Sequence, residues 1–91
     1  LGYQAIIAHV QKQVVWPTGA GLVCAKGRVF VRFTVAANGL MYNMRVVKGL
    51  HPLLDAEAVR AVQMLSRLQP GREHGNPVAV TLTVPVCFAC D

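Results

Sequence analysis

Apolar residues recur along this chain with two different periods, and the two periods predict helices and strands. In residues 1–15 and again in residues 52–68, apolar positions return every three or four residues, which is typical of a helix with one buried face. The apolar positions of the first helix are Tyr3, Ile6, Ile7, Val10 and Val14. Those of the second helix are Leu54, Ala58, Ala61, Val62 and Leu65, with Glu57, Arg60 and Gln63 expected on its polar side.

Two further stretches alternate with a period of two, which predicts strands with one face in a core. In residues 28–35 the inward positions are Val29, Val31, Phe33 and Val35. The dipeptide Asn38-Gly39 suits the positive backbone angles of a tight hairpin turn, so an antiparallel strand is expected to return over residues 40–47. Its expected inward positions are Met44 and Val46.

The last strand is predicted over residues 78–88, after a polar connection at residues 72–77. Pro85 lies inside it and cannot donate a backbone hydrogen bond, so this strand belongs at the edge of a sheet. A free edge is a template on which an extended peptide can bind through main-chain hydrogen bonds. The sequence therefore predicts a peptide-binding edge near its end.

Local signals mark where the helices begin and end. Trp16-Pro17 ends the first helix, because proline disfavours helical geometry in the residue before it, and a loop is expected over residues 18–27. Asp55 lies near the start of the second helix, where its carboxylate can accept from unpaired backbone N–H groups. Pro70-Gly71 follows the end of that helix.

These elements predict an α+β fold of the order αββαβ, in which two helices pack on one face of a three-stranded antiparallel sheet. With 91 residues, of which 54% are hydrophobic and 14% charged, the chain is expected to form a single domain over residues 1–91. No apolar run approaches the roughly 18 residues that cross a bilayer. Since the chain begins at Leu1, any membrane anchor and linker are expected upstream, outside this chain.

The net charge of +5 comes from nine Lys and Arg against four Asp and Glu. The basic residues are spread singly, without a basic run or the aromatic and basic strand of an RNA-binding domain. We therefore expect no nucleic-acid partner, and a basic surface that steers association with acidic partners.

The sequence offers no arrangement of side chains that predicts catalysis, so no enzyme activity and no cofactor are expected. Asp55 and Glu57 are only two residues apart on a helix and diverge, which makes them a poor acid-base pair. A nucleophile elbow and a phosphate-binding loop are both missing from the sequence.

The three cysteines raise an alternative, a zinc or thiol-redox module. Cys87 and Cys90 form a CxxC pair, but the pair follows a strand, whereas a redox pair needs a helix start to lower the pKa of its first thiol. Structural zinc needs four ligands, and no second paired motif accompanies this one, so no metal is expected. Disulfide pairing among Cys24, Cys87 and Cys90 stays open.

Several motifs along the chain together resemble the TonB C-terminal domain family, in its Bacteroidetes-like subset. They are Trp16-Pro17 after the first helix, the strand from Gly27 to Val35, Asn38-Gly39, Val46-Val-Lys-Gly49, Leu54-Asp55-x-x-Ala58 and Val84-Pro85-Val86-x-Phe88. Two positions depart from the family pattern, because Trp16 replaces the usual Tyr and Leu68-Gln69 replace an aromatic residue before Pro70-Gly71.

The resemblance implies a periplasmic domain of an energy transducer, anchored in the inner membrane by a segment outside this chain. Such a domain binds the TonB box of outer-membrane transporters for substrates such as siderophores by β-strand addition, and couples a motor driven by the proton gradient to import. The motor would be reached through the missing N-terminal region. The implied binding residues are Gln13, Val78, Ala79, Val80, Thr81, Leu82, Thr83 and Val84.

Two other outcomes are compatible with the sequence. The same domain could serve as an envelope peptide-binding or sensor appendage of another membrane protein. Because the final strand has a free edge, two copies could also pair edge to edge as a homodimer.

Overall fold

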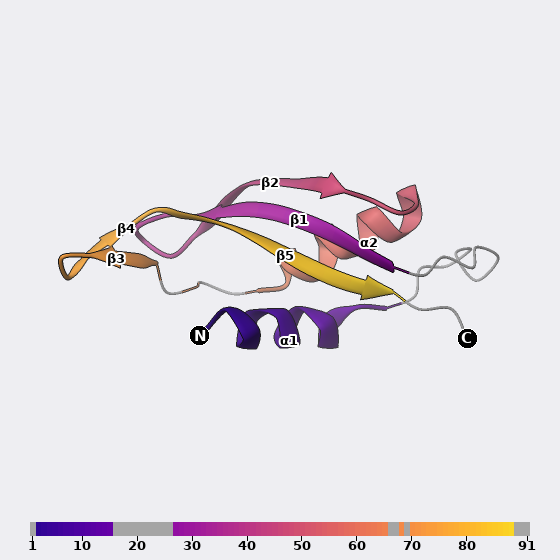
Figure 1. The fold of residues 1–91 in the computed structure, drawn as a ribbon, viewed down its shortest axis with the longest axis horizontal. Coiled ribbons are helices and arrows are strands. Elements are labelled where there is room, and N and C mark those ends of the chain that lie inside the picture. The colour runs from indigo at the N-terminus through magenta and orange to yellow at the C-terminus, as the bar shows by residue number, and fades with distance from the viewer. Residues whose placement is uncertain (1, 16–26, 66–67, 69, 89–91) are drawn as a thin grey trace.

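The computed structural model describes residues 2–15, 27–65, 68 and 70–88 (Figure 1). Along the chain the elements are α1 (Tyr3–Gln13), β1 (Gly27–Val35), β2 (Met41–Lys48), α2 (Pro52–Gln63), β3 (Gly71–Glu73), β4 (Asn76–Val78) and β5 (Val80–Phe88). The Trp16-Pro17 motif and residues 18–26 of the predicted loop lie outside the described residues. In the part of the chain that is described, no helix is long and apolar enough to span a membrane.

Three strands form one antiparallel sheet in the order β2-β1-β5, and both helices lie on the same face of it (Figure 1). α1 packs against β5, while α2 packs against β1 and β2. The core lies between the two layers and draws its buried side chains from both helices and from β1 and β5. This arrangement confirms the predicted α+β fold.

The central strand β1 follows the predicted alternation closely. Its four predicted inward residues, Val29, Val31, Phe33 and Val35, are all buried. On β2 the predicted inward positions Met44 and Val46 are partly buried against the core, and so is Met41. The spacing from Met41 to Met44 departs from strict alternation because Asn43 has a left-handed backbone (φ 55°), which shifts the register with β1.

The second helix is shorter than its apolar pattern predicts. α2 ends at Gln63, although Leu65 and Leu68 beyond it are buried as their spacing implies. The backbone N–H of Leu68 donates to the carbonyl of Gly39 at 2.9 Å, so the chain turns across the β1–β2 hairpin and the helix does not continue. Burial can therefore persist in a helical pattern after the helix itself has ended.

The start of α2 also differs in detail from the prediction. The helix is capped by His51, whose Nδ1 accepts from the N–H of Leu53 at 3.2 Å. Asp55 does accept from backbone N–H groups, but those groups belong to Leu50 and His51, which precede the helix. Two side chains therefore share the capping that was expected of one.

The segment before β5 is a hairpin, and the prediction of a plain connection at residues 72–77 was wrong. β3 and β4 pair antiparallel around His74-Gly75, where both residues have positive φ (52° and 81°). Two successive residues with positive φ are typical of a tight hairpin turn. As a consequence the last sheet strand begins at Val80, and Val78 belongs to β4 with Ala79 between the strands.

Candidate peptide-binding edge

The last strand lies at one edge of the sheet, as Pro85 predicted. β5 pairs with β1 along its full length, from Val80 opposite Val35 to Phe88 opposite Gly27, without a register shift. In the described part of the chain, no strand pairs with its other side. An edge of nine residues therefore runs beside α1.

Two side chains of α1 identify which backbone groups of β5 point away from β1. The Tyr3 hydroxyl donates to the Thr83 carbonyl at 2.6 Å, and Gln11 bonds both backbone groups of Cys87. Because backbone groups alternate in direction along a strand, the backbone groups of Thr81 and Pro85 also point away from β1. The side-chain hydroxyls of Thr81 and Thr34 lie 3.1 Å apart, which places the Thr81 side chain on the face of the sheet opposite the helices.

The outward groups divide this edge into an open and a closed stretch. The open stretch comprises the N–H and carbonyl of Thr81 and the N–H of Thr83, for which the described residues supply no partner. In the closed stretch Gln11 occupies both groups of Cys87, and Pro85 offers only a carbonyl. An added strand therefore meets free donors at the beginning of β5 and none at its end.

The structure brings together only part of the residues that the family resemblance implied. Val80, Thr81, Leu82, Thr83 and Val84 lie on β5, but Val78 and Ala79 do not. Within β5, the backbone groups of Val80, Leu82 and Val84 point toward β1, because they alternate with those of Thr81 and Thr83. Thr81 and Thr83 are thus the members of the set whose backbone groups face an incoming strand.

Gln13 lies at the other end of the edge. α1 runs alongside β5 in the same direction, since Tyr3 reaches Thr83 and Gln11 reaches Cys87. Gln13 follows at the end of α1, beyond the Cys87 contact, which is six residues or about 20 Å along β5 from Thr81. Its carbonyl accepts from Arg60 Nη2 at 2.6 Å. The structure therefore places Gln13 away from the open stretch.

A polar network on α2 fixes the end of α1 in this position. The Glu57 carboxylate accepts from the Val15 N–H at 2.7 Å and from Arg60 Nε and Nη2 at 2.7 and 2.6 Å. The hydrogen bond from Arg60, helped by that from the Val15 N–H, holds the pKa of Glu57 below its ordinary value although burial opposes this. The placement of Glu57 on a polar, solvent-facing side was wrong, because this residue is 8% exposed.

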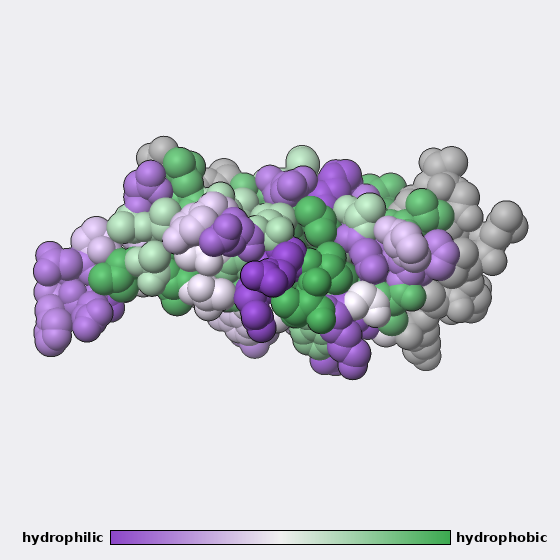
Figure 2. Space-filling view, turned by 90° about the horizontal axis from the view of Figure 1, so that it is seen from above, coloured by the Kyte–Doolittle hydropathy of each residue, from purple (hydrophilic) through white to green (hydrophobic). Residues whose placement is uncertain are grey.

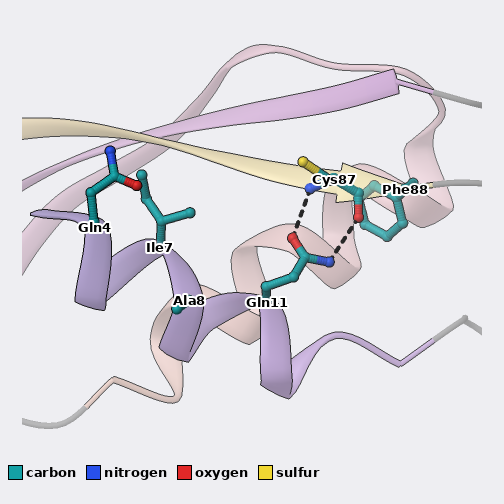
Figure 3. A pocket seen from close by; sticks show the side chains of 6 residues that line it. All are labelled: Gln4, Ile7, Ala8, Gln11, Cys87 and Phe88. Carbon is teal, nitrogen blue, oxygen red and sulfur yellow. Dashed lines mark hydrogen bonds between the residues drawn. The ribbon is translucent and has the colours of Figure 1, made fainter.

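A shallow pocket of about 540 Å³ lies between α1 and the end of β5 (Figure 3). Its lining consists of Gln4, Ile7, Ala8, Gln11, Cys87 and Phe88. Apart from the two glutamines the lining side chains are apolar or a thiol. Figure 3 shows Gln11 reaching from α1 to the backbone of Cys87, so the pocket adjoins the closed stretch of the edge.

The sheet face opposite the helices is basic. Arg28 and Arg32 lie on it from β1, and Arg45 lies directly opposite Arg32 on β2. The described acidic residues belong to α2 and β3 and not to the three strands of this sheet. Figure 2, seen from above, shows strongly hydrophilic side chains beside hydrophobic ones in the middle of the surface on that side. The outward side of the sheet therefore carries unbalanced positive charge.

The zinc and redox alternatives gain no support from the described residues. Within residues 2–15, 27–65, 68 and 70–88, no three His, Cys, Asp or Glu side chains gather closely enough to hold a metal ion. Cys87 is exposed, while Cys24 and Cys90 lie outside the described residues, so the disulfide pairing stays open.

Comparison with known proteins agrees with the fold. A family model described as the C-terminal domain of the Gram-negative bacterial TonB protein matches residues 12–90. An NMR structure of the Helicobacter pylori TonB C-terminal domain (residues 179–285 of that protein) is 24% identical, with a TM-score of 0.78 over 98% of this chain and 81% of that one. A second (residues 194–285) is 25% identical, with a TM-score of 0.72 over 94% and 90%.

A search of curated proteins found no match. The family model nevertheless covers β1, β2, α2 and β5 as well as the hairpin between α2 and β5. The chain therefore belongs to the TonB C-terminal domain family.

Proposed function

We propose that this domain binds the TonB box of outer-membrane transporters as an added strand on β5. The observation that carries the proposal is the unshifted edge of β5, on which the N–H and carbonyl of Thr81 and the N–H of Thr83 are open. An extended peptide that pairs there would extend the sheet to four strands. Because backbone groups supply the bonding, transporters with different box sequences could share one site.

The open stretch supports a weak and reversible interaction. The Thr81 N–H and carbonyl and the Thr83 N–H offer three hydrogen bonds. At a net of about 0.5 to 1.5 kcal/mol each, less the cost of ordering the peptide, they favour an affinity no tighter than about micromolar. Such binding suits a domain that must engage and release transporters repeatedly.

The family gives the setting for this interaction. TonB C-terminal domains are non-catalytic, periplasmic parts of energy transducers. In our proposal a segment outside this chain anchors the protein in the inner membrane and connects it to a motor driven by the proton gradient. Force on the bound box would then act through β5 and drive import of a substrate such as a siderophore.

Strand geometry favours this way of transmitting force. An added strand would pair with β5, and β5 pairs with the central strand β1 over nine residue pairs. Tension applied along the peptide would load these backbone hydrogen bonds in parallel. The side chains of Val84 and Val86 also fix β5 in the core. Both the pairing with β1 and the burial of these side chains therefore hold β5 in place under such tension.

An NMR titration of the labelled domain tests the proposal. A TonB-box peptide from a transporter of the same organism should shift the amides of Thr81 and Thr83 most strongly, while the amides of β2 should move little. If several such peptides at near-millimolar concentration shifted no amide of β5, the transport-coupling proposal would be wrong. The upstream part of the protein would then have to reveal another envelope role.

A further inference from the structure

We propose that Gln11 acts as a gate on the closed stretch of the peptide-binding edge, between Pro85 and Cys87. Its side chain blocks this stretch and can move away so that a peptide pairs there. The inference rests on the proposed function and concerns how far along β5 a peptide can pair. Gln11 and Tyr3 both precede the residues that the family model matches. The gate is formed by a side chain of α1.

The side-chain amide of Gln11 takes the place of a residue in a neighbouring strand. Its Nε2 donates to the Cys87 carbonyl at 3.0 Å, and its Oε1 accepts from the Cys87 N–H at 3.0 Å (Figure 3). A residue of an antiparallel partner strand would bond the same two groups through its own N–H and carbonyl. A peptide can therefore pair with Cys87 only after Gln11 has left.

Opening this gate costs little in packing. Gln11 is exposed, and its two bonds with Cys87 lie at the surface, so the side chain can swing into water by changing rotamer. The Glu57 and Arg60 network meanwhile holds the end of α1 in place. A peptide that displaces Gln11 exchanges two hydrogen bonds for two equivalent ones and gains only what its side chains add.

The adjoining pocket indicates which peptides gain affinity when they displace Gln11. Ile7, Ala8 and Phe88 line it, and the Gln11 side chain borders it on the way to Cys87 (Figure 3). With a volume of about 540 Å³ it can accept one or two apolar side chains of a strand that pairs along Cys87. The ligand of the closed stretch is therefore an extended peptide that carries apolar side chains in the part that lies beside Pro85 and Cys87.

Peptide length separates the two stretches experimentally. A synthetic peptide of about five residues covers the open stretch, and a TonB-box peptide of about ten residues covers the whole of β5. Replacing Gln11 by Ala frees Cys87, so Gln11→Ala should bind the longer peptide about tenfold more tightly than the wild type does. The shorter peptide should bind both proteins equally. Isothermal calorimetry on the intact domain measures these affinities.

Gln63→Ala is the matched control. Gln63 is also an exposed helical glutamine, but it lies at the end of α2, outside the pocket lining, and bonds neither group of Cys87. Gln63→Ala should leave both affinities within about twofold. Equal gains from Gln63→Ala and Gln11→Ala, or no gain from Gln11→Ala with the longer peptide, would overturn the gate while leaving the proposed function standing.

Amide exchange gives a second readout that needs no peptide. The Cys87 N–H donates to Gln11 in the wild type, so its exchange should become at least about fivefold faster in Gln11→Ala and stay unchanged in Gln63→Ala. An unchanged Cys87 rate in Gln11→Ala would overturn the gate. If neither peptide bound any of the three proteins, the proposed function would fail, and the peptide-gating role of Gln11 would fail with it.

Discussion

The two edges of the sheet differ in how they meet solvent. β5 runs straight against β1 through nine residue pairs, whereas β2 shifts register with β1 twice. One of these irregularities surrounds Asn43, which has a left-handed backbone, and β2 also carries Arg45 and Lys48. Bulges and charged side chains are common devices that keep an edge from pairing with another chain.

β5 lacks those devices and is covered by side chains of α1 in their place. Tyr3 and Gln11 bond Thr83 and Cys87 through groups that can leave by rotating. A bulge is permanent because it is built into the backbone, while a side-chain cover is reversible. The edge at β2 is therefore blocked by its backbone, whereas the edge at β5 is guarded by side chains that can move away, and only the guarded edge can serve as a binding site.

The largest effect on peptide affinity is expected from removing the free backbone donors of β5. Thr81→Pro with Thr83→Pro deletes both N–H groups that face an incoming strand, and we expect peptide affinity to fall by more than about tenfold. The fold should survive, because Pro85 already occupies an equivalent outward position of this strand. Calorimetry with a TonB-box peptide measures the loss.

Thr81→Val with Thr83→Val is the control for these prolines. Valine keeps both N–H groups and the branched shape of threonine, so the affinity should stay within about threefold of the wild type. If the valine variant lost as much affinity as the proline variant, the side chains and not the backbone of β5 would carry the interaction.

A second test loosens the attachment of α1, whose side chains cover β5. Glu57→Ala removes the acceptor of Val15 and Arg60, and we expect the free energy of unfolding to fall by about 2 to 3 kcal/mol, because both donors lose a hydrogen bond to a charged group. Chemical denaturation measures this loss. Glu73→Ala, which removes an exposed acid on β3, should change stability by less than about 0.5 kcal/mol.

Acid should reproduce part of that effect. The pKa of Glu57 is lower in the folded domain than its ordinary value of 4.5, so its ionised form stabilises the fold above that pH. This contribution should be lost as the pH falls below about 4.5 and through the lowered pKa of the folded state. Denaturation curves at several pH values should show a smaller decline in Glu57→Gln than in the wild type. Identical declines in the two proteins would contradict the role given to Glu57.

The smallest expected effect concerns the blocked edge. Asn43→Ala places a residue that disfavours a left-handed backbone at φ 55°, and should cost about 1 kcal/mol of stability. Asn43→Gly should cost only a few tenths, since glycine accepts this conformation. Neither change should alter peptide affinity. A change in affinity with either variant would mean that β2 takes part in binding.

Regular periodicity predicted the parts of this fold that depend on local pattern. The alternation of Val29 and Val31 predicted β1, and Pro85 predicted the free edge of β5, because both signals act within one strand. The hairpin of β3 and β4 was missed, since His74-Gly75 is not one of the dipeptides, such as Asn-Gly or Asp-Gly, that signal a tight hairpin turn. The burial of Glu57 depends on where the end of α1 lies, which no pattern within α2 reveals.

The guarded state of β5 could not be predicted from the sequence either. Gln11 and Cys87 are 76 residues apart and meet only because α1 runs alongside β5 in the same direction. A glutamine on the exposed side of a predicted helix has no distinguishing feature in the sequence. The resemblance to TonB domains instead pointed to Gln13, which the structure places beyond the Cys87 contact at the end of α1.

The most direct test of strand addition on β5 is amide hydrogen exchange across the whole sheet, measured with and without a saturating TonB-box peptide. We expect exchange of the Thr81 and Thr83 amides to slow by at least about tenfold on binding, while the amides of β2 keep their rates. Protection on β2, or binding without protection at Thr81 and Thr83, would contradict the claim that β5 is the edge on which a partner strand is added.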